Sequence, residues 1–290
     1  MAPSLENLLV VGIASSALFD LTQSDAVFHA SGEQAYREYQ SAHLSEPFAP
    51  GVAFPFIRRL LRLNSLGPLV EVIVLSRNSP DTGLRILRSA AHHSLAITRA
   101  IFTQGRAPHE FMPALNMSLF LSANENDVRK ATSAGLPAGQ VLASSFQDDE
   151  DPALRIAFDF DGVLADDAAE RVYQTGGLDE FQQHEATNVV SPLDPGPLRN
   201  FLAGINRIQR LAEDRIRVSV VTARSAPAHE RAINSLQAWG LTVNDAFFLG
   251  GLQKAPILDV LRPHIFFDDQ RRHLVQTVPC VHIPFGVSNE

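Results

Sequence analysis

The stretch "RIAFDFDGVLADD", Arg155 to Asp167, places two carboxylates, Asp159 and Asp161, two positions apart at the end of an apolar run. Short apolar runs that end in polar residues are typical of parallel strands buried on both faces. In parallel α/β sheets, ligands bind beyond the carboxyl ends of the strands. We therefore interpret this stretch as a buried strand that delivers two aspartates to a binding site.

Apolar runs around this strand recur in the first half of the chain with a constant shift of 146 residues, as from Val72 to Val218. "VIVLSRNS" aligns with "VSVVTARS", and the same shift pairs three more segments without gaps. These are "VVGIASSAL" with "IAFDFDGVL", "ITRAIFTQG" with "VNDAFFLGG", and "LFLSAN" with "IFFDDQ". Several segments in one register indicate an internal duplication.

Each half is predicted to alternate strands and helices, which is typical of a parallel sheet with helices on both faces. In the helix expected at "AHERAINSLQAWG", the spacing places Ile233, Leu236 and Trp239 on one side. The acidic stretch "SSFQDDEDPAL", Ser144 to Leu154, has the composition of a linker. We predict an α/β protein of two tandem Rossmann-like, parallel-sheet domains, residues 1–146 and 147–290.

Composition excludes several classes of protein. The chain of 290 residues is 45% hydrophobic and 19% charged, which suits a soluble globular protein of two domains. Its net charge of −8 argues against a nucleic-acid partner, because affinity for nucleic acid comes mostly from basic side chains. The lone cysteine, Cys280, excludes an intrachain disulfide and is expected in the core.

The N-terminal run "LLVVGIASSAL" lacks the basic flank of a signal peptide and is expected to be a buried strand. No other apolar run approaches the roughly 20 residues of a membrane span. We therefore expect a cytoplasmic protein without a membrane partner. Assembly as a homo-oligomer stays open.

The paired aspartates suit phosphate chemistry. Asp159 and Asp161 can act as nucleophile and as general acid/base on the same substrate atom. Carboxylates this close need a cation, and Mg²⁺ prefers oxygen ligands and often recruits a substrate phosphate. Asp268 and Asp269 end another predicted strand and can complete such a metal site.

A phosphate site is predicted from three further features. Thr222 ends the run "VSVVT" and offers a hydroxyl, while Lys254 begins the next helix and offers a positive charge. Gly250 and Gly251, just ahead of Lys254, let the backbone pass close to an anion. Each feature alone is common on protein surfaces, but their order along the chain, each at or just after a strand end, favours a catalytic site.

At these residues the chain resembles the haloacid dehalogenase superfamily, whose motifs fit "DFDGV", "VVTAR", Lys254 and "FFDD". Over nearly its whole length it resembles the cytosolic 5'-nucleotidase type I family, through "LSRNSPDTGLRI", "LFLSANENDV", "VTARSAPAHERAI" and "AFFLGG". One departure is that the first motif of this family is closer to "DGDAV", whereas Phe160 and Gly162 stand here. The resemblance implies Mg²⁺-dependent hydrolysis of nucleoside 5'-monophosphates, AMP foremost, through an aspartyl-phosphate.

The resemblance also implies roles for particular residues. Asp159 attacks phosphorus, and Asp161 protonates the leaving oxygen and then deprotonates the hydrolytic water. The implied metal ligands are Asp159, the backbone carbonyl of Asp161, and Asp268 or Asp269. The implied contacts to the phosphoryl group come from Thr222 and Lys254. Ala223 and Arg224 follow Thr222 directly and are predicted to meet the substrate, and a role in helix capping stays open for Arg224.

The segment from Asp166 to Asn188 lies where enzymes of this superfamily carry a cap over the site, so residues 166–188 are predicted to form a small cap inserted in the second domain. Gly176 and Gly177 suit a hinge in it. Tyr173 and Phe181 either stack on a base or pack a short helix.

The first half reads as a catalytically dead copy. The shift of 146 residues pairs Asp159 with Ile13, Asp161 with Ser15, Thr222 with Ser76, Lys254 with Pro108, and Asp268 with Ser122. This half nevertheless keeps polar residues at its predicted strand ends. A nucleoside-binding role and a role in turn formation both stay open for Ser76, Arg77, Asn78, Asp81 and Asn124.

Two other functions remain open. A phosphatase of the same superfamily that acts on another small phosphate ester would share every catalytic residue and differ in its cap and pocket. A protein that binds nucleotides without turnover is disfavoured by the intact set of Asp159, Asp161, Thr222 and Lys254.

Overall fold

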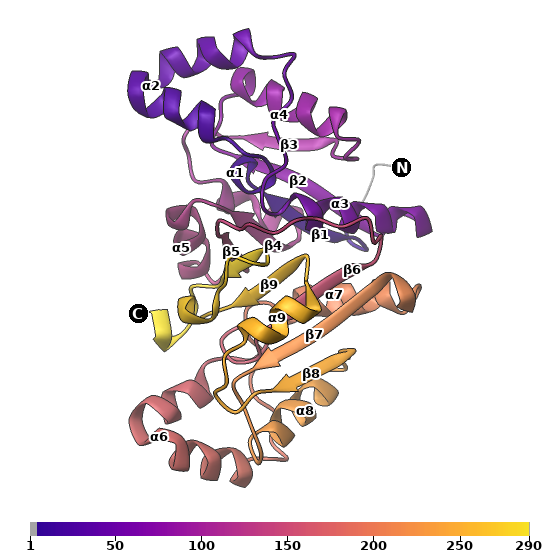
Figure 1. Ribbon diagram of the computed structural model, residues 1–290, viewed down its shortest axis with the longest axis vertical. Helices are drawn as coiled ribbons and strands as arrows, with labels where there is room; N and C mark the ends of the chain where they lie inside the picture. The colour runs from indigo at the N-terminus through magenta and orange to yellow at the C-terminus, as the bar shows by residue number, and fades with distance from the viewer. Residues whose placement is uncertain (1–4, 290) are drawn as a thin grey trace. The chain divides into compact units, whose positions relative to one another are not determined.

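The computed structural model describes residues 5–289 and divides into two compact units, a first that ends at Leu136 and a second that begins at Pro137. Figure 1 shows that both units are α/β structures with a mostly parallel sheet flanked by helices. The predicted α/β class is therefore confirmed. Among the described residues, no helix is both long and apolar enough to span a membrane.

The first unit has a sheet of parallel strands in the order β3-β2-β1-β4. Runs rich in β-branched residues, such as "VEVIVLS" of β2, favour the strand conformation. The elements of this unit are β1 (Leu9–Ile13), α1 (Ser15–Leu18), α2 (Thr22–Ala42), α3 (Phe54–Arg62), η1 (Leu63–Leu66), β2 (Val70–Ser76), α4 (Pro80–His92), β3 (Arg99–Phe102), η2 (Pro108–Phe111), η3 (Pro113–Leu115), β4 (Met117–Ser122) and α5 (Glu125–Ser133).

The second unit has parallel strands in the order β8-β7-β6-β9-β10, followed by β5, which is antiparallel to β10. Its elements are β5 (Ala138–Val141), β6 (Leu154–Phe158), α6 (Ala168–Thr187), α7 (Arg199–Gln209), η4 (Glu213–Arg215), β7 (Ile216–Thr222), α8 (His229–Ala238), β8 (Asp245–Phe248), α9 (Ala255–Leu261), β9 (Ile265–Asp268), η5 (Arg271–His273), β10 (Cys280–His282) and η6 (Val287–Asn289).

The helices of the second unit cover both faces of its sheet. The crossovers β6–α7–β7 and β8–α9–β9 step across the sheet in opposite directions. Right-handed connections therefore put α7 and α9 on opposite faces, and Figure 1 shows α9 in front of the strands and α7 behind them.

The division between the units falls before the predicted linker. The sequence places the boundary at residue 146, whereas the second unit already begins at Pro137. The reason is β5, which pairs with β10 through Val141 opposite Val281. The acidic stretch that follows has no regular secondary structure between β5 and β6, as a linker composition predicts.

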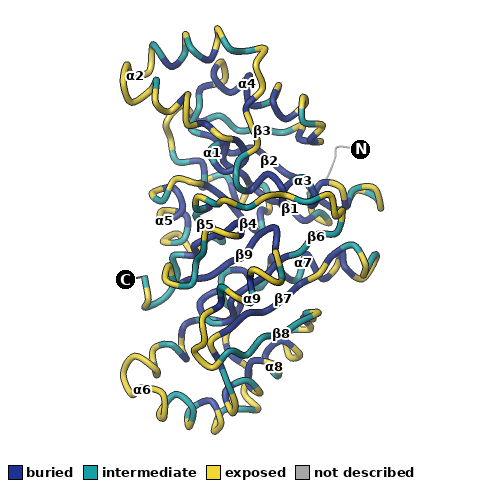
Figure 2. The backbone as a smooth tube through the Cα atoms, in the orientation of Figure 1, coloured by how far each residue is buried: buried dark blue, intermediate teal, exposed yellow. Residues whose placement is uncertain are grey.

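The central strands of each unit are buried, whereas α2 and α6 are largely exposed, as the colours of Figure 2 show. Cys280 is fully buried beside Ala157, Val221 and Phe266, so its predicted core position is confirmed. Burial raises the pKa of its thiol to about 12. Of the apolar residues predicted on one side of α8, Leu236 is buried, whereas Ile233 is 37% exposed.

The strand registers of the two units match, with one offset. β1 sets Leu9 opposite Val70, and β6 sets Leu154 opposite Ile216. Val70 and Ile216 lie 146 positions apart, but Leu9 and Leu154 lie 145 apart. The second unit therefore has one residue more than the first between these two strands.

Because of this extra residue, two of the residue pairs predicted between the two halves were wrong. The amide of Ala14 donates to the carbonyl of Leu121 at 2.8 Å, and that of Asp159 donates to the carbonyl of Phe267 at 2.7 Å. Ala14 and not Ile13 is thus the counterpart of Asp159, and Ser16 and not Ser15 is the counterpart of Asp161. An ungapped comparison misplaces both pairs, because the extra residue lies in the long connection after β6.

Each unit carries one long helix that is broken at a glycine. The break in α2 lies at Gly32, with φ 80° and ψ −172°, and the break in α6 lies at Gly177, with φ 75° and ψ −168°. Figure 1 shows each helix as two arms that meet at an angle. Only glycine adopts this conformation readily, so the sequence itself places both kinks.

Candidate active site

The carboxyl ends of β6 and β9 bring the predicted carboxylates and lysine together. These strands are parallel neighbours, so Asp159 just after β6 and Asp268 at the end of β9 reach the same edge of the sheet. Lys254, just ahead of α9, places Nζ 2.8 Å from Asp159 Oδ2 and 2.6 Å from Asp268 Oδ2. All three side chains are buried.

Asp269 adds a further buried carboxyl group to this cluster. Its Oδ1 is buried and has no hydrogen-bond partner among the described residues. Burial, reinforced by the charges of Asp159 and Asp268, raises the pKa of Asp269 to about 9. An orphaned buried carboxylate oxygen is costly unless a cation or a proton satisfies it.

The remaining charges of the cluster are only partly balanced. Burial raises the pKa of Asp159 to about 7, although Lys254 opposes this shift. Burial would also raise the pKa of Asp268, but Lys254 and His273 outweigh it and lower that pKa. Burial acts to lower the pKa of Lys254, and its two carboxylate partners reverse this and raise it. One lysine thus faces three aspartates, and oxygen donors in this number fit a divalent cation.

Asp161 is held from the opposite side by an arginine. Arg224 Nη2 lies 2.7 Å from Asp161 Oδ1, and Nε lies 2.8 Å from Oδ2, which makes a bidentate pair. The same guanidinium binds Glu185 on α6 through Nη1, which also donates to the carbonyl of Ala228. All three nitrogens of Arg224, which the sequence assigned to substrate binding, therefore contact protein groups.

Glu185 is the centre of a buried ionic cluster that the sequence does not predict. It is fully buried and binds Arg224 and Arg231, the latter at 2.7 Å between Oε1 and Nη1. Burial would raise the pKa of Glu185, but the two arginines outweigh it and lower that pKa. In the first unit, Gln40 and Arg85 form the matching contact at 3.1 Å.

Thr222 and Ala223 belong to a tight loop after β7. Thr222 is buried, and its Oγ1 accepts a hydrogen bond from the amide of Arg224 at 3.2 Å. The hydroxyl proton of Thr222 therefore remains available for a ligand oxygen. The amides of Gly250 and Gly251 donate to the carbonyls of Arg224 and Ala223, which fixes this loop.

Gly162 explains part of the departure in the first motif. Its φ is +70°, and a Cβ at this position would lie 2.7 Å from the carboxyl carbon of Asp269. A side chain would therefore displace the carboxylate and strain the backbone. The other departing residue, Phe160, is buried, and Arg224 lies over its ring at 5.2 Å.

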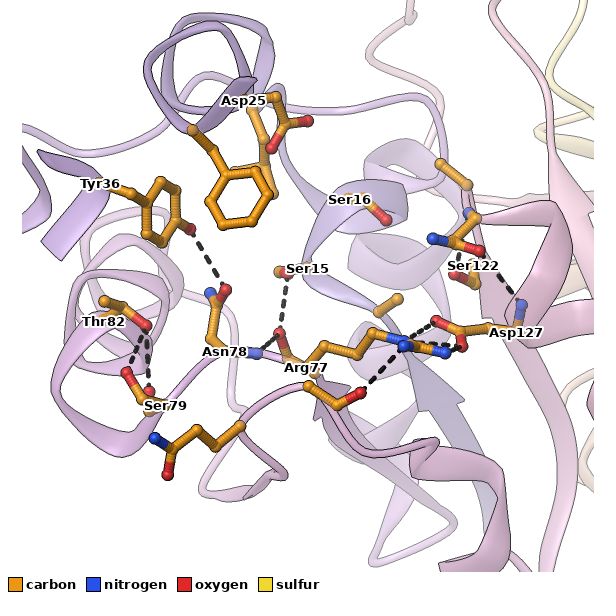
Figure 3. A pocket seen from close by; sticks show the side chains of 18 of the residues that line it. Ser15, Ser16, Asp25, Tyr36, Arg77, Asn78, Ser79, Thr82, Ser122 and Asp127 are labelled. Carbon is orange, nitrogen blue, oxygen red and sulfur yellow. Dashed lines mark hydrogen bonds and ion pairs between the residues drawn. The ribbon is translucent and has the colours of Figure 1, made fainter. Parts of the chain in front are cut away.

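Four of the five predicted contacts of the first unit line a cavity of about 750 Å³ within that unit (Figure 3), whereas Asp81 is not part of its lining. Arg77 forms an ion pair with Asp127 and donates to the carbonyl of Gly105. Asn124 caps α5 by accepting from the amide of Asp127. Ser76 bonds to Ser15, and Asn78 accepts from Tyr36, so all four predicted residues have local partners. Their binding of substrate stays a prediction.

Buried carboxylates, a lysine and a hydroxyl lie at the carboxyl edge of a parallel sheet in this α/β protein, and groups of these types fit a phosphate and a divalent cation. The 5'-nucleotidase family model matches residues 1–290, so the chain belongs to the 5'-nucleotidase family. The resemblance found in the sequence is thereby confirmed.

The chain is also similar to a curated human protein (Homo sapiens), cytosolic 5'-nucleotidase 1B, with 33% identity over 293 residues. The similarity covers 94% of this chain and 47% of that protein, so the chain spans about half the length of this relative. No solved structure matches the chain significantly.

Proposed function

We propose that this protein hydrolyses nucleoside 5'-monophosphates, with AMP as the favoured substrate, to a nucleoside and phosphate. Membership of the 5'-nucleotidase family and the name of the human relative support this activity. The observation that carries the proposal is the buried cluster of Asp159, Lys254, Asp268 and Asp269 at the sheet edge. The cytoplasm is the proposed location, since that relative is named cytosolic.

In the proposed mechanism, a carboxylate oxygen of Asp159 attacks phosphorus, and the bond from phosphorus to the 5'-oxygen breaks. Asp161 donates a proton to the departing 5'-oxygen. Asp161 then takes a proton from a water molecule, which attacks the phosphorus of the aspartyl-phosphate and releases inorganic phosphate. This step returns both aspartates to their starting state.

Lys254 and Thr222 are proposed to hold the phosphoryl oxygens. The Lys254 ammonium group already lies between two carboxylates, so it is fixed in position before substrate arrives. Thr222 offers its hydroxyl proton from the end of β7. Fixed donors aimed at developing charge supply much of the rate enhancement in phosphoryl transfer.

The donor set fits Mg²⁺, as the orphaned Asp269 oxygen and the crowding of carboxyl groups indicate. The residues proposed to hold it are Asp159, the backbone carbonyl of Asp161, and the acidic pair Asp268 and Asp269. When bound, Mg²⁺ neutralises charge on the phosphoryl group and on the carboxylates around it.

Arg224 is proposed to orient Asp161, and Glu185 to link this contact to α6. The bidentate pair fixes the plane of the Asp161 carboxylate, so that it presents the same edge to the substrate. Residues 166–188 are proposed to act as a cap. Glu185 on α6 binds Arg224, and Arg224 binds Asp161, so a shift of the cap is proposed to move the Asp161 carboxylate.

We also propose that the two units arose by duplication and that the first is catalytically dead. The equal strand orders, the matching registers and the two kinked helices support this origin. The first unit has Ala14, Ser16 and Pro108 at the positions of Asp159, Asp161 and Lys254. It therefore lacks a nucleophile and an acid/base.

The proposal is tested by a phosphate-release screen over nucleoside 5'-monophosphates and sugar phosphates, with Mg²⁺ and with excess chelator. We expect release from AMP in Mg²⁺ and none in chelator. Faster release from sugar phosphates would favour the alternative of another small-phosphate phosphatase. AMP binding without any release would instead indicate a nucleotide-binding protein without turnover.

A further inference from the structure

We propose that the first unit contains a second ligand site, the cavity of about 750 Å³ beyond the ends of β1, β2 and β4, and that this site binds an uncharged nucleoside. The volume lies in the range of pockets for small ligands, roughly 300–1,000 Å³. The position is the one at which α/β sheets bind ligands.

The charges around this cavity disfavour a phosphate. Arg77 is paired with Asp127, and Arg37 is paired with Glu33 at 2.7 Å. Asp25 also lines the cavity, and burial raises the pKa of its carboxyl group. Both arginines that line the cavity are thus already paired with carboxylates, so neither offers an unpaired charge to a phosphate dianion.

Hydroxyl and amide groups dominate the remaining polar lining. Ser76 and Ser122 end β2 and β4, and Ser15 begins α1 just after β1. Figure 3 shows Tyr36, Asn78 and Thr82 on one side of the cavity and Ser122 and Asp127 on the other. Neutral donors and acceptors of this kind suit the hydroxyls of a ribose and the edge of a base.

An aromatic pair on α2 supplies a platform for the base. Phe28 lines the cavity and is 46% exposed, and its ring meets that of Tyr36 edge-on at 5.8 Å and 88°. The matching positions on α6 are Tyr173, 44% exposed, and Phe181, whose rings meet at 6.2 Å and 89°. The first unit thus keeps the aromatic pair of its counterpart but has lost the residues that handle phosphate.

The choice of a nucleoside rests on the proposed nucleotidase activity, because the same aromatic pair lies on the α6 cap proposed for the catalytic unit. With its base stacked on Phe28 and its ribose among the serines, the nucleoside would place its 5'-hydroxyl inside the first unit. There it would lie at the position that corresponds to the predicted phosphate site of the second unit. The ligand predicted for the first unit is therefore the substrate class of the second unit without its phosphate.

The test is hydrogen exchange of the full-length protein with adenosine as the probe, together with calorimetric titration. We expect adenosine to slow exchange in residues 22–42 and 76–82. Phe28→Ala should weaken this binding roughly tenfold, since stacking of a base on an aromatic ring contributes on that order. Phe28→Tyr, which keeps the ring, should retain binding, and Tyr173→Ala on α6 is the matched control that should leave protection of the first unit unchanged.

Three outcomes would overturn the inference: no protection of these segments at saturating adenosine, protection that Phe28→Ala does not change, or stronger protection by AMP than by adenosine in the Asp159→Asn variant. Phosphate release from AMP is measured on the same wild-type preparation. Turnover without protection of the first unit refutes this inference alone, and protection without turnover refutes the proposed function alone.

Discussion

Lys254 lies between two buried carboxylates, and its side chain is 1% exposed. A lysine in this position has two physical roles. It cancels part of the charge that burial of Asp159 and Asp268 would leave uncompensated, and it presents a fixed ammonium group to a phosphate. The two roles can be separated by experiment because one acts on stability and the other on turnover.

Asp159→Asn is expected to abolish phosphate release while the fold stays intact. The amide keeps the shape of the side chain but is not a nucleophile. Release by the pure variant is measured against the wild type, with circular dichroism as the check on folding. Asp245→Asn is the control, since Asp245 pairs with Arg217 at the beginning of β8. More than a few per cent of residual activity in Asp159→Asn would reject its assigned role.

Lys254→Met is expected to lower the free energy of unfolding by about 3–5 kcal/mol in chelator, because it leaves two buried carboxylates without their cation. The measurement is denaturant unfolding with and without Mg²⁺. Lys130→Met, at an exposed position on α5, should change stability by less than about 0.5 kcal/mol. Equal stability of the two variants in chelator would contradict the pairing.

Most of the residues in the candidate site could be predicted from sequence. Asp159, Thr222 and Asp268 end or follow apolar runs, and parallel strands bring their carboxyl ends to one edge whatever the loop lengths. Glu185 could not be found in this way. It lies on a mostly exposed helix, where a glutamate is ordinarily solvated, and only the three-dimensional contact with Arg224 and Arg231 reveals its burial.

The buried face of helix α8 also could not be predicted from the sequence. Its buried residues are Arg231, Ala232, Ser235 and Leu236, so the buried face is centred away from Ile233 and is largely polar. Hydrophobic periodicity could not reveal this, because the buried positions include an arginine that pairs with Glu185 and a serine that donates to the carbonyl of Arg231. Polar partners supplied by other segments decide which face of this helix is covered.

Glu185→Gln is expected to destabilise the protein by about 3–5 kcal/mol at neutral pH, since two buried arginines lose their shared carboxylate. The folded-state pKa of Glu185 lies below the ordinary value of 4.5. Its stabilisation is therefore fully present above pH 4.5 and is lost as the pH falls through the folded-state pKa. The groups that face this carboxylate are His184, Arg224 and Arg231.

The measurement is denaturant unfolding of wild type and Glu185→Gln from pH 3 to pH 8. The difference in unfolding free energy should be constant above pH 4.5 and narrow below it. Glu180→Gln, on an exposed position of the same helix, is the control and should follow the wild type. A difference that widens with falling pH would show that Glu185 is not the charged partner of the arginines.

The kink of α6 gives a second prediction about an element. Gly177 has φ 75° and ψ −168°, and a Cβ there would meet no atom within 4 Å. Gly177→Ala therefore introduces backbone strain alone, about 1–3 kcal/mol. We expect a lower kcat/KM for AMP, because straightening α6 shifts Glu185 and with it Arg224. The readouts are AMP kinetics and denaturant unfolding.

Gly32→Ala is the matched control, since Gly32 has φ 80° in α2 and a Cβ there is equally free of contacts. Gly32→Ala should lower the free energy of unfolding by a similar amount but leave the kcat/KM for AMP unchanged. A lower kcat/KM in both variants, or in neither, would contradict the proposed link between the α6 kink and catalysis.

Across the whole chain, aligning the first half of the sequence with the second reveals the repeated strands but does not pair every residue correctly. Strands β2, β3 and β4 follow the shift of 146 residues, whereas β1 and β6 differ by 145. The extra residue lies in the long connection after β6, where insertions cost little because loop entropy grows slowly with length. A short strand such as β5 carries too little periodicity to be recognised before its partner β10 is known.

The pairing of β5 with β10 leads to a prediction about the boundary between the units. A fragment that begins at Pro137 keeps Val141 opposite Val281, the bond from the amide of Leu142 to the carbonyl of Cys280, and the bond from Ser145 to Gln276. A fragment that begins at Gln147 loses all of these. At about 1 kcal/mol for each hydrogen bond, the shorter fragment should be less stable by roughly 3 kcal/mol or more.

Thermal unfolding of the two fragments, followed by circular dichroism, measures this difference. For a unit of this size, roughly 3 kcal/mol corresponds to a melting temperature lower by about 6–12 °C in the fragment that begins at Gln147. The second unit has its own sheet and core, so the fragment that begins at Pro137 is expected to unfold cooperatively. Equal melting temperatures would place the boundary at the acidic linker. Failure of both fragments to fold would show that the second unit depends on the first.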